Sequence, residues 1–247
     1  MIFIGTSGYN YTHWGNDVFY PSELPEKKWL EFYATYFNTV ELNVTFYRLP
    51  TKKAFESWYM RTPSQFLFSI KGSRFITHIK RLKDCQEPLA LFLDRASCLK
   101  EKLGVILWQL PPRFKVDLKR LEEFFLLISK IPISKKIPHA FEFRDDSWFC
   151  SQVFMILERF NFSFCISHGS GIPMMEKITS NIIYLRLHGG KLLYGSNYSE
   201  NELKNWAKKI QSWKENGKII FVYFNNDAYG FAIKNAMTLK RLLGIDE

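Results

Sequence analysis

Short apolar runs alternate with longer segments of mixed apolar and polar residues along the whole chain. Runs this short, rich in aromatic and branched residues and bounded by polar positions, are typical of buried strands. We expect strands at Ile2–Gly5, Thr39–Asn43, Phe66–Lys71, Val105–Leu110, Ala140–Arg144, Phe162–Ser167, Ile182–His188 and Ile219–Asn225. The segments between them show the helical spacing of apolar residues. We expect helices near Pro25–Tyr36, Lys52–Arg61, Pro88–Lys102, Leu118–Ser129, Trp148–Phe160, Glu200–Glu215 and Ala228–Leu243.

Several of these helices carry signals for their ends. Ser199 precedes one of them and is followed three residues later by a glutamate, the pattern of a capping box. Thr51 and Asp117 stand directly before two other helices, where an N-cap residue belongs. Gly104 and Gly217 stand where helices are expected to end. The signals support the assignment of helices between the strands.

The order of the elements predicts the fold class. Eight strands alternate with seven or eight helices within 247 residues, which agrees with an α/β chain folded as a (β/α)8 TIM barrel. No linker, low-complexity segment or change of composition divides the sequence, so we expect a single domain over residues 1–247. A doubly wound open sheet is the alternative, because periodicity does not show whether a sheet closes.

The segment HAFEFRDDSWF, residues 139–149, alternates large aromatic side chains with full charges. In a barrel strand, successive side chains face the helix layer and the barrel interior in turn. Phe141 and Phe143 are therefore predicted to face the helices. Glu142 and Arg144 are predicted to point inward at the carboxyl end of the strand, where active sites of such barrels are built.

Other strands carry polar residues near their carboxyl ends with the same alternation. These residues are Glu41, Asn43, Lys71, Gln109, Arg186, His188 and Asn225, and Asn226 follows where the last strand closes. Glu142 could pair with Arg186 merely to fill the barrel, and Glu41 and Lys71 could do the same. Buried ion pairs stabilise poorly once the cost of desolvation is counted, so the sequence favours a ligand site at the mouth of the barrel.

The residue types predict a polar, anion-binding pocket. Lysine and arginine, together with amide donors, suit phosphate or carboxylate oxygens, which accept several directed hydrogen bonds. The predicted substrate-binding residues are Asn43, Lys71, Gln109, Arg144, Arg186, Asn225 and Asn226. Glu41 and Glu142 are candidate catalytic groups, acting as base and acid if their environments separate their pKa values. His188 is a third catalytic candidate, as a proton shuttle, or it only holds its loop by hydrogen bonds.

Cofactor motifs are missing from the sequence. It has no HExxH ligand spacing, no Walker A loop and no GxGxxG fingerprint, and basic residues at the predicted mouth would repel a metal cation. Cys85, Cys98, Cys150 and Cys165 are scattered along the chain and predict neither disulfides nor a zinc site. We therefore expect neither a cofactor nor a metal.

The chain is basic, with a formal net charge of +10. Such a charge attracts anionic partners, but the lysines come mostly in dispersed pairs, such as Lys27-Lys28 and Lys208-Lys209, which are typical of solvated helix faces. The longest apolar runs are too short to span a bilayer. The first ten residues, MIFIGTSGYN, do not resemble a signal peptide. We expect no membrane partner and a cytoplasmic location.

Eight blocks of sequence carry a resemblance to a known family. They are GTSGYNYTHW (Gly5–Trp14), VELNVTFYRLP (Val40–Pro50), the ITH-containing run Lys71–Leu82, WQLPP (Trp108–Pro112), FEFRDDSW (Phe141–Trp148), YLRLHG (Tyr184–Gly189), YSENELKNWAKKI (Tyr198–Ile210) and the VYFNND run (Val222–Leu239). In this order they resemble the YecE-like family, domain of unknown function 72. The resemblance implies a TIM barrel and no established reaction or catalytic residue. It also implies a fold similar to that of barrel endonucleases that cut at abasic sites, which suggests nucleic acid by analogy alone.

Two classes of function agree with the predicted site. The first is a metal-independent hydrolase, acting on a phosphoester or a glycoside, with a small anionic or phosphate-bearing ligand in the mouth. The alternative is a non-catalytic barrel that senses a ligand or binds nucleic acid. The basic segment Ser73–Asp84 would extend the site towards a polyanion, or it is an ordinary solvated loop. Loop aromatics could stack on a base or sugar, or act as hydrophobic anchors: Tyr9, Tyr11, Trp14, Phe46, Tyr47 and Trp148.

Overall fold

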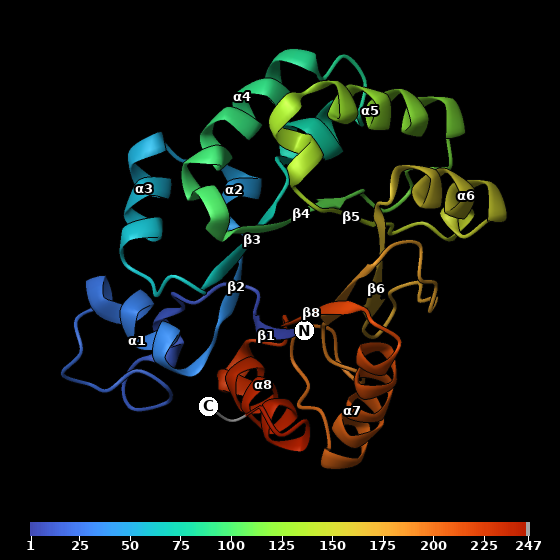
Figure 1. The fold of residues 1–247 in the computed structure, drawn as a ribbon. Helices are drawn as coiled ribbons and strands as arrows, with labels where there is room; N and C mark the ends of the chain where they lie inside the picture. The colour runs from blue at the N-terminus through green and yellow to red at the C-terminus, as the bar shows by residue number, and fades with distance from the viewer. Residues whose placement is uncertain (246–247) are drawn as a thin grey trace.

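The computed structural model describes residues 1–245, which form eight parallel strands ringed by helices (Figure 1). The strands are β1 Ile2–Thr6, β2 Thr39–Leu42, β3 Leu67–Lys71, β4 Leu103–Gln109, β5 His139–Glu142, β6 Ser163–His168, β7 Ile182–Leu187 and β8 Ile219–Phe224. Hydrogen-bonded ladders join them in the order β1-β8-β7-β6-β5-β4-β3-β2. A parallel bridge between Ser7 and Glu41 brings β1 next to β2 and nearly closes the barrel. The predicted (β/α)8 fold is confirmed, and every predicted strand is present.

The α-helices lie between the strands in sequence and outside them in space. They are α1 Trp29–Tyr36, α2 Val44–Tyr47, α3 Lys52–Met60, α4 Gln86–Ala96, α5 Leu118–Lys130, α6 Ser151–Phe160, α7 Glu200–Glu215 and α8 Phe231–Leu242. Short 3-10 turns cover Thr12–Trp14, Glu26–Lys28, Ser97–Lys102, Pro132–Lys136, Asp146–Trp148 and Ala228–Gly230, and a π-helical turn covers Phe75–Ile79. All seven predicted helices are present, and the outer turns of several are 3-10 turns. No helix within residues 1–245 combines the length and the hydropathy needed to cross a membrane.

The predicted helix signals are confirmed in all but one place. Ser199 forms a capping box at the start of α7, and the side chains of Thr51 and Asp117 accept helix N–H groups at the starts of α3 and α5. Gly217 follows α7 with a left-handed φ of 76°, which favours glycine. The prediction for Gly104 was wrong, because this residue lies inside β4. A side chain there would meet the ring of Phe221 in the barrel interior.

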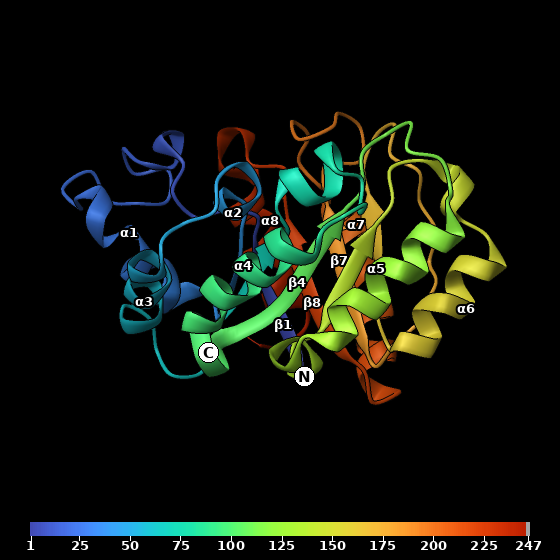
Figure 2. The ribbon, with the colours of Figure 1, turned by 90° about the horizontal axis from the view of Figure 1, so that it is seen from above.

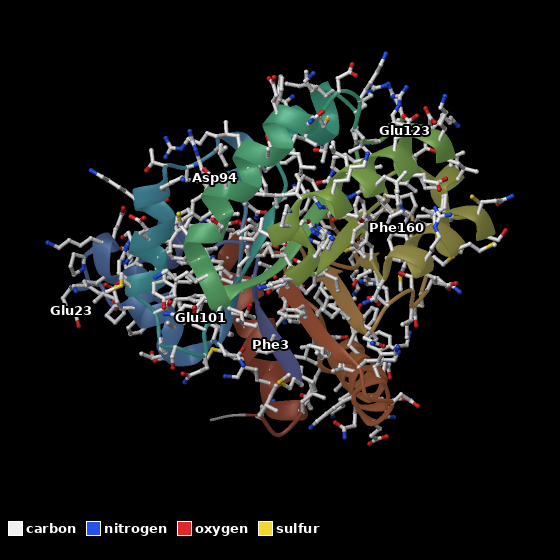
Figure 3. The ribbon with its side chains drawn as sticks, turned by 45° about the horizontal axis from the view of Figure 1, so that its top comes forward. Phe3, Glu23, Asp94, Glu101, Glu123 and Phe160 are labelled. Atoms are coloured by element: carbon white, nitrogen blue, oxygen red, sulfur yellow. The ribbon has the colours of Figure 1, made fainter. Side chains whose placement is uncertain are left out.

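The larger part of the core lies between the strands and the helices. On α5, Leu121, Phe124, Phe125 and Ile128 share one buried face, as the helical repeat requires. The ring of Phe141 in β5 packs against this face, with its centre 4.4 Å from that of the tilted ring of Phe125. The predicted outward orientation of the aromatic residues in β5 is thus confirmed. Charged residues such as Asp94 and Glu123 lie on the exposed outer surface of the helix layer (Figure 3).

A second, smaller core fills the barrel itself. It consists of Val105, Leu107, Ala140, Cys165, Tyr184, Phe221 and Tyr223. The phenol of Tyr223 lies 2.6 Å from the hydroxyl of Thr39 and donates to Ser69 at 2.8 Å, so its polar atom is satisfied within the barrel. In Figure 2 the strands run upward from the side of the N-terminus, and the loops that follow them gather at the upper side. The charged residues predicted for the site occupy this upper end.

Candidate functional site

Arg186 in β7 is the centre of the charged cluster. Its Nε and Nη2 donate to the two oxygens of Glu41 at 3.0 and 2.7 Å, a bidentate fork. Its Nη1 donates to Oε2 of Glu142 at 2.6 Å. The Arg186 side chain is only 1% exposed, so this guanidinium joins two carboxylates inside the barrel and has little left to offer a ligand.

The carboxylate of Glu41 is saturated with donors. Besides the two bonds from Arg186, it accepts from the hydroxyl of Ser7 at 2.5 Å and from the phenol of Tyr184 at 2.7 Å. A carboxylate offers about four lone-pair sites, so these four bonds use its capacity. In this arrangement Glu41 has no free lone pair with which to act as a catalytic base.

Glu142 is held in its ionised form. Burial alone would raise its pKa, but the guanidinium groups of Arg144 and Arg186 hold the pKa well below its usual range. Arg144 donates from Nε to Glu142 Oε1, and its side chain is still partly exposed towards the mouth. An ionised carboxylate with so low a pKa is a poor proton donor and a weak base, so the acid–base role predicted for Glu142 has no support in this geometry.

His188 is a buried, uncharged imidazole at the end of β7. Burial, followed by the nearby arginines, lowers its pKa well below its usual range. Its Nδ1 lies 3.0 Å from Nδ2 of Asn225, and its Nε2 lies 3.4 Å from Nη2 of Arg144. The backbone N–H of Tyr194 donates to the His188 carbonyl at 2.5 Å. The phenol ring of Tyr194 makes an edge-to-face contact with the imidazole. These contacts favour the loop-holding alternative over a proton shuttle.

Lys71 at the end of β3 differs from the other cations of the cluster. Its Nζ lies 4.0 Å from the ring centre of Phe46, and within residues 1–245 it has no hydrogen bond and no ion pair. Burial, assisted by the charge of Arg186, lowers its pKa to about 8. The alternative in which Glu41 and Lys71 form a buried pair is not observed, because Arg186 occupies that carboxylate.

A pocket of about 710 Å³ opens beside Lys71 at the mouth of the barrel. It is lined by Gly8, Tyr9, Asn10, Tyr11, Leu42, Asn43, Val44, Tyr47, Arg48, Trp58, Lys71, Arg186, Tyr194, Asn225 and Asp227. Of the predicted binding residues, Asn43, Lys71, Arg186 and Asn225 therefore share one pocket. The Oδ1 atom of Asn43 is buried, and within the described part of the chain it has no hydrogen-bond partner. A buried acceptor of this kind is available to a donor on a ligand.

Three predicted binding residues, Arg144, Gln109 and Asn226, do not line this pocket, and the two amides among them are bonded within the protein. The amide of Gln109 donates to the carbonyl of Leu110 at 3.4 Å. The amide of Asn226 donates to Ser196 O at 2.9 Å and to Asn235 Oδ1 at 2.8 Å. Asn226 therefore ties the loop after β7 to α8, and a direct contact with substrate has no support for either residue.

The loop aromatics divide into anchors and surface groups. Trp14 and Trp148 are fully buried in the main core, and Phe46 is nearly so, which makes them hydrophobic anchors and not stacking groups. Tyr47 is 77% exposed, and Tyr9 and Tyr11 line the pocket with it. The sequence interpretation missed Ser7 as a partner of the carboxylates, although a polar residue directly after the first strand was a usable signal.

The described residues offer little to a metal ion. Across residues 1–245, no group of three or more histidine, cysteine, aspartate or glutamate side chains is arranged to hold one. The two glutamates of the cluster are already bonded to arginines. Cationic neighbours and saturated carboxylates both oppose metal binding at this mouth.

Comparisons with known proteins agree on one family. Residues 3–247 match the family described as "Protein of unknown function DUF72". The chain is 30% identical to the UPF0759 protein YunF of Bacillus subtilis over 278 aligned positions, which cover the whole chain and 96% of that protein. It is 38% identical to the UPF0759 protein YecE of Escherichia coli over 85 residues, 34% of the chain and 31% of YecE. The crystal structure of a DUF72 family protein from Thermotoga maritima superposes with a TM-score of 0.86 at 29% identity, covering 99% of each chain.

Proposed function

The chain belongs to the DUF72 family of proteins of unknown function, and we propose that it binds a small phosphate- or carboxylate-bearing ligand in the pocket at the barrel mouth. The observation that carries the proposal is Lys71, a largely buried cation without a counter-ion among the described residues. Lys71 lines the pocket together with Asn43 and Asn225.

The charge balance of the cluster supports an anionic ligand. Two carboxylates, Glu41 and Glu142, stand against three basic groups, Arg144, Arg186 and Lys71. The arginines pair with the carboxylates, so the excess positive charge falls on the lysine. A buried unpaired charge is costly, and an anion within about 4 Å would relieve that cost by roughly 4 kcal/mol at an effective dielectric constant near 20.

Binding is better supported than hydrolysis. A metal-independent hydrolase needs a base that can take a proton from water, and the carboxylate of Glu41 is saturated while that of Glu142 is strongly acidic. His188 is uncharged but lies out of solvent. A phosphoester or glycoside hydrolase therefore stays a prediction that this arrangement of the side chains does not favour.

Calorimetric titration with inorganic phosphate and with glycerol 3-phosphate tests the proposal. Lys71→Met should weaken binding by about tenfold or more, because it removes the unpaired charge. Lys71→Arg keeps the charge and should retain most of the affinity. Lys83→Met, which removes an exposed lysine of the neighbouring segment, serves as the matched control for net charge. Affinity unchanged by Lys71→Met, or reduced equally by Lys83→Met, would rule out this role.

A second candidate is the binding of single-stranded nucleic acid. Within the described residues, the exposed aromatic side chains are Tyr36, Tyr47, Phe75, Tyr194 and Tyr229. All except Tyr36 lie in segments that follow strands, around the mouth. Aromatic rings beside basic residues are how proteins stack successive bases without sequence preference.

Oligonucleotide titration distinguishes the two candidates. A nucleic-acid site predicts that Tyr47→Ala and Tyr229→Ala each weaken binding of a single-stranded oligonucleotide several-fold, while Tyr36→Ala does not. Repeating the titration at low and at physiological salt identifies contacts to phosphates that only reflect the basic surface, because these weaken steeply with salt. If all three variants bound the oligonucleotide equally weakly, the small anionic ligand would be favoured over nucleic acid.

A further inference from the structure

Two buried lysines of this barrel have opposite surroundings. Lys102, at the other end of the barrel, donates to the carbonyls of Tyr59 and Thr62 at 2.6 and 2.7 Å and to the Thr62 hydroxyl at 3.2 Å. All three protons of its ammonium group are used. The ammonium group of Lys71 makes no hydrogen bond within the described residues, and the ring face of Phe46 lies 4.0 Å from it. Lys102 is therefore structural, whereas the amine of Lys71 is free to react.

The free amine of Lys71 lies beside a pocket that opens to solvent. It lines the pocket at the mouth together with Tyr11, Asn43 and Asn225, whereas Lys102 is only 4% exposed. The ring of Phe46 excludes water from one side of the amine. A lysine desolvated in this way, next to other cations, is the arrangement that activates an amine as a nucleophile.

Burial and the neighbouring charges favour the uncharged amine. At pH 7.5 a lysine of ordinary pKa is only about 0.1% uncharged, whereas with a pKa of about 8 roughly a quarter is uncharged. The charged and titratable groups around the amine come from β2, β5, β7 and the turn after β3, and they are Glu41, Glu142, Arg144, Arg186, His188 and His78. The guanidinium groups lower the pKa of Lys71 and the carboxylates raise it.

We propose that the ligand of this pocket carries a carbonyl group next to its anionic group, and that Lys71 forms an imine with that carbonyl. The ligand class is that of 2-oxo acids and keto phosphates. The inference rests on the proposed function, since the anionic group brings the ligand to the lysine. A protonated imine keeps a positive charge at the same nitrogen, so the attraction for the anion persists after the bond has formed.

The step balances without an oxidant, a reductant or a metal. The uncharged nitrogen of Lys71 attacks the carbonyl carbon, and one proton passes from nitrogen to the carbonyl oxygen to give a carbinolamine. The carbon–oxygen bond then breaks, and the hydroxyl group leaves as water with the second proton of the amine. The products are the imine and one water molecule, and the imine nitrogen then takes up a proton from the solvent to give the charged form.

Reductive trapping tests the inference. The full-length protein is mixed with dihydroxyacetone phosphate or pyruvate and treated with borohydride, which reduces an imine to a stable secondary amine. Intact-mass spectrometry followed by peptide mapping should find a single adduct, at Lys71. The matched ligands glycerol 3-phosphate and lactate, which carry a hydroxyl in place of the carbonyl, should give none.

Variants separate the inference from the proposed function. Lys71→Arg should still bind glycerol 3-phosphate but lose the adduct, and Lys71→Met should lose both. Trapping in wild type should rise with pH through about 8.

Binding of glycerol 3-phosphate without any adduct would overturn the imine and leave the anion pocket standing. An adduct at Lys71 without binding of glycerol 3-phosphate or phosphate would overturn the anion pocket instead. Adducts spread over surface lysines, or retained in Lys71→Arg, would also overturn the imine.

Discussion

Replacing Arg186 by methionine should be among the most damaging single changes in this barrel. The guanidinium makes two bonds to Glu41 and one to Glu142, and all three side chains are excluded from solvent. Methionine fills similar space but leaves the buried carboxylate of Glu41 without a cation and that of Glu142 with Arg144 alone. Breaking a buried ion pair by removing one partner costs about 3–5 kcal/mol. That is a large part of the roughly 5–15 kcal/mol by which folded proteins are stable.

Urea unfolding followed by tryptophan fluorescence measures this loss. At pH 7 the Arg186→Met protein should unfold at a markedly lower urea concentration than wild type. The deficit should shrink as the pH falls towards 5, because a buried carboxylate that has lost its cation is more stable in the protonated form. In wild type the guanidinium groups of Arg144 and Arg186 hold the pKa of Glu142 well below this range, so it stays ionised.

Arg61→Met is the matched control. Arg61 also forms a bidentate pair, with Glu31 at 3.1 and 2.8 Å, but both side chains of that pair are about one-third exposed. Exposed pairs contribute about 0–1 kcal/mol. If Arg186→Met cost no more than Arg61→Met, or if its deficit did not depend on pH, the account of the buried cluster would be refuted.

Three further outcomes are expected from the same unfolding assay. Gly72→Ala should destabilise by about 1–3 kcal/mol, because its Cβ would lie 2.3 Å from the buried indole of Trp108; unchanged stability would mean that the indole can move. Lys102→Met should lower the free energy of unfolding by about 1–3 kcal/mol, because it leaves three buried acceptors without a donor. Unchanged stability would refute the structural role of Lys102. Wild-type stability should fall below about pH 4.5, since Glu142 has a lower pKa in the folded than in the unfolded chain. Glu142→Gln should flatten that fall, and an equally steep fall would assign it to other carboxylates.

The fold could be predicted because the order of residues within each strand indicates which side chains face the helices and which face the barrel interior. Along β5 and the two residues after it, aromatic residues and charges alternate, which is the order expected of a barrel strand with one face to the helices and one to the interior. Phe141 does pack on α5, and Glu142 does lie inside. The misassignment of Gly104 arose because glycine occurs both after helices and inside strands.

The partners within the site could not be predicted in the same way. The alternation of residues shows that Glu41, Lys71 and Arg186 point inward, but not which of them meet. Glu41 and Lys71 lie on neighbouring strands, which suggested a pair. Arg186 comes from β7, across the barrel, and its long side chain reaches the same carboxylate and offers it a fork. Such a choice depends on the height of each residue along the barrel, which the sequence does not contain.

Because the arginines pair with Glu41 and Glu142, the amine of Lys71 stays unpaired, and its reactivity depends on the charges around it. Glu142 raises the pKa of Lys71 and Arg144 lowers it, so neutralising them should change the amine in opposite directions. Glu142→Gln should speed the labelling of Lys71 by pyridoxal phosphate and borohydride at pH 7, and Arg144→Gln should slow it. A purely structural effect of the two substitutions would loosen the site in both variants and change labelling in the same direction. Opposite changes would show that the arginines, by occupying the carboxylates, keep the lysine unpaired and reactive.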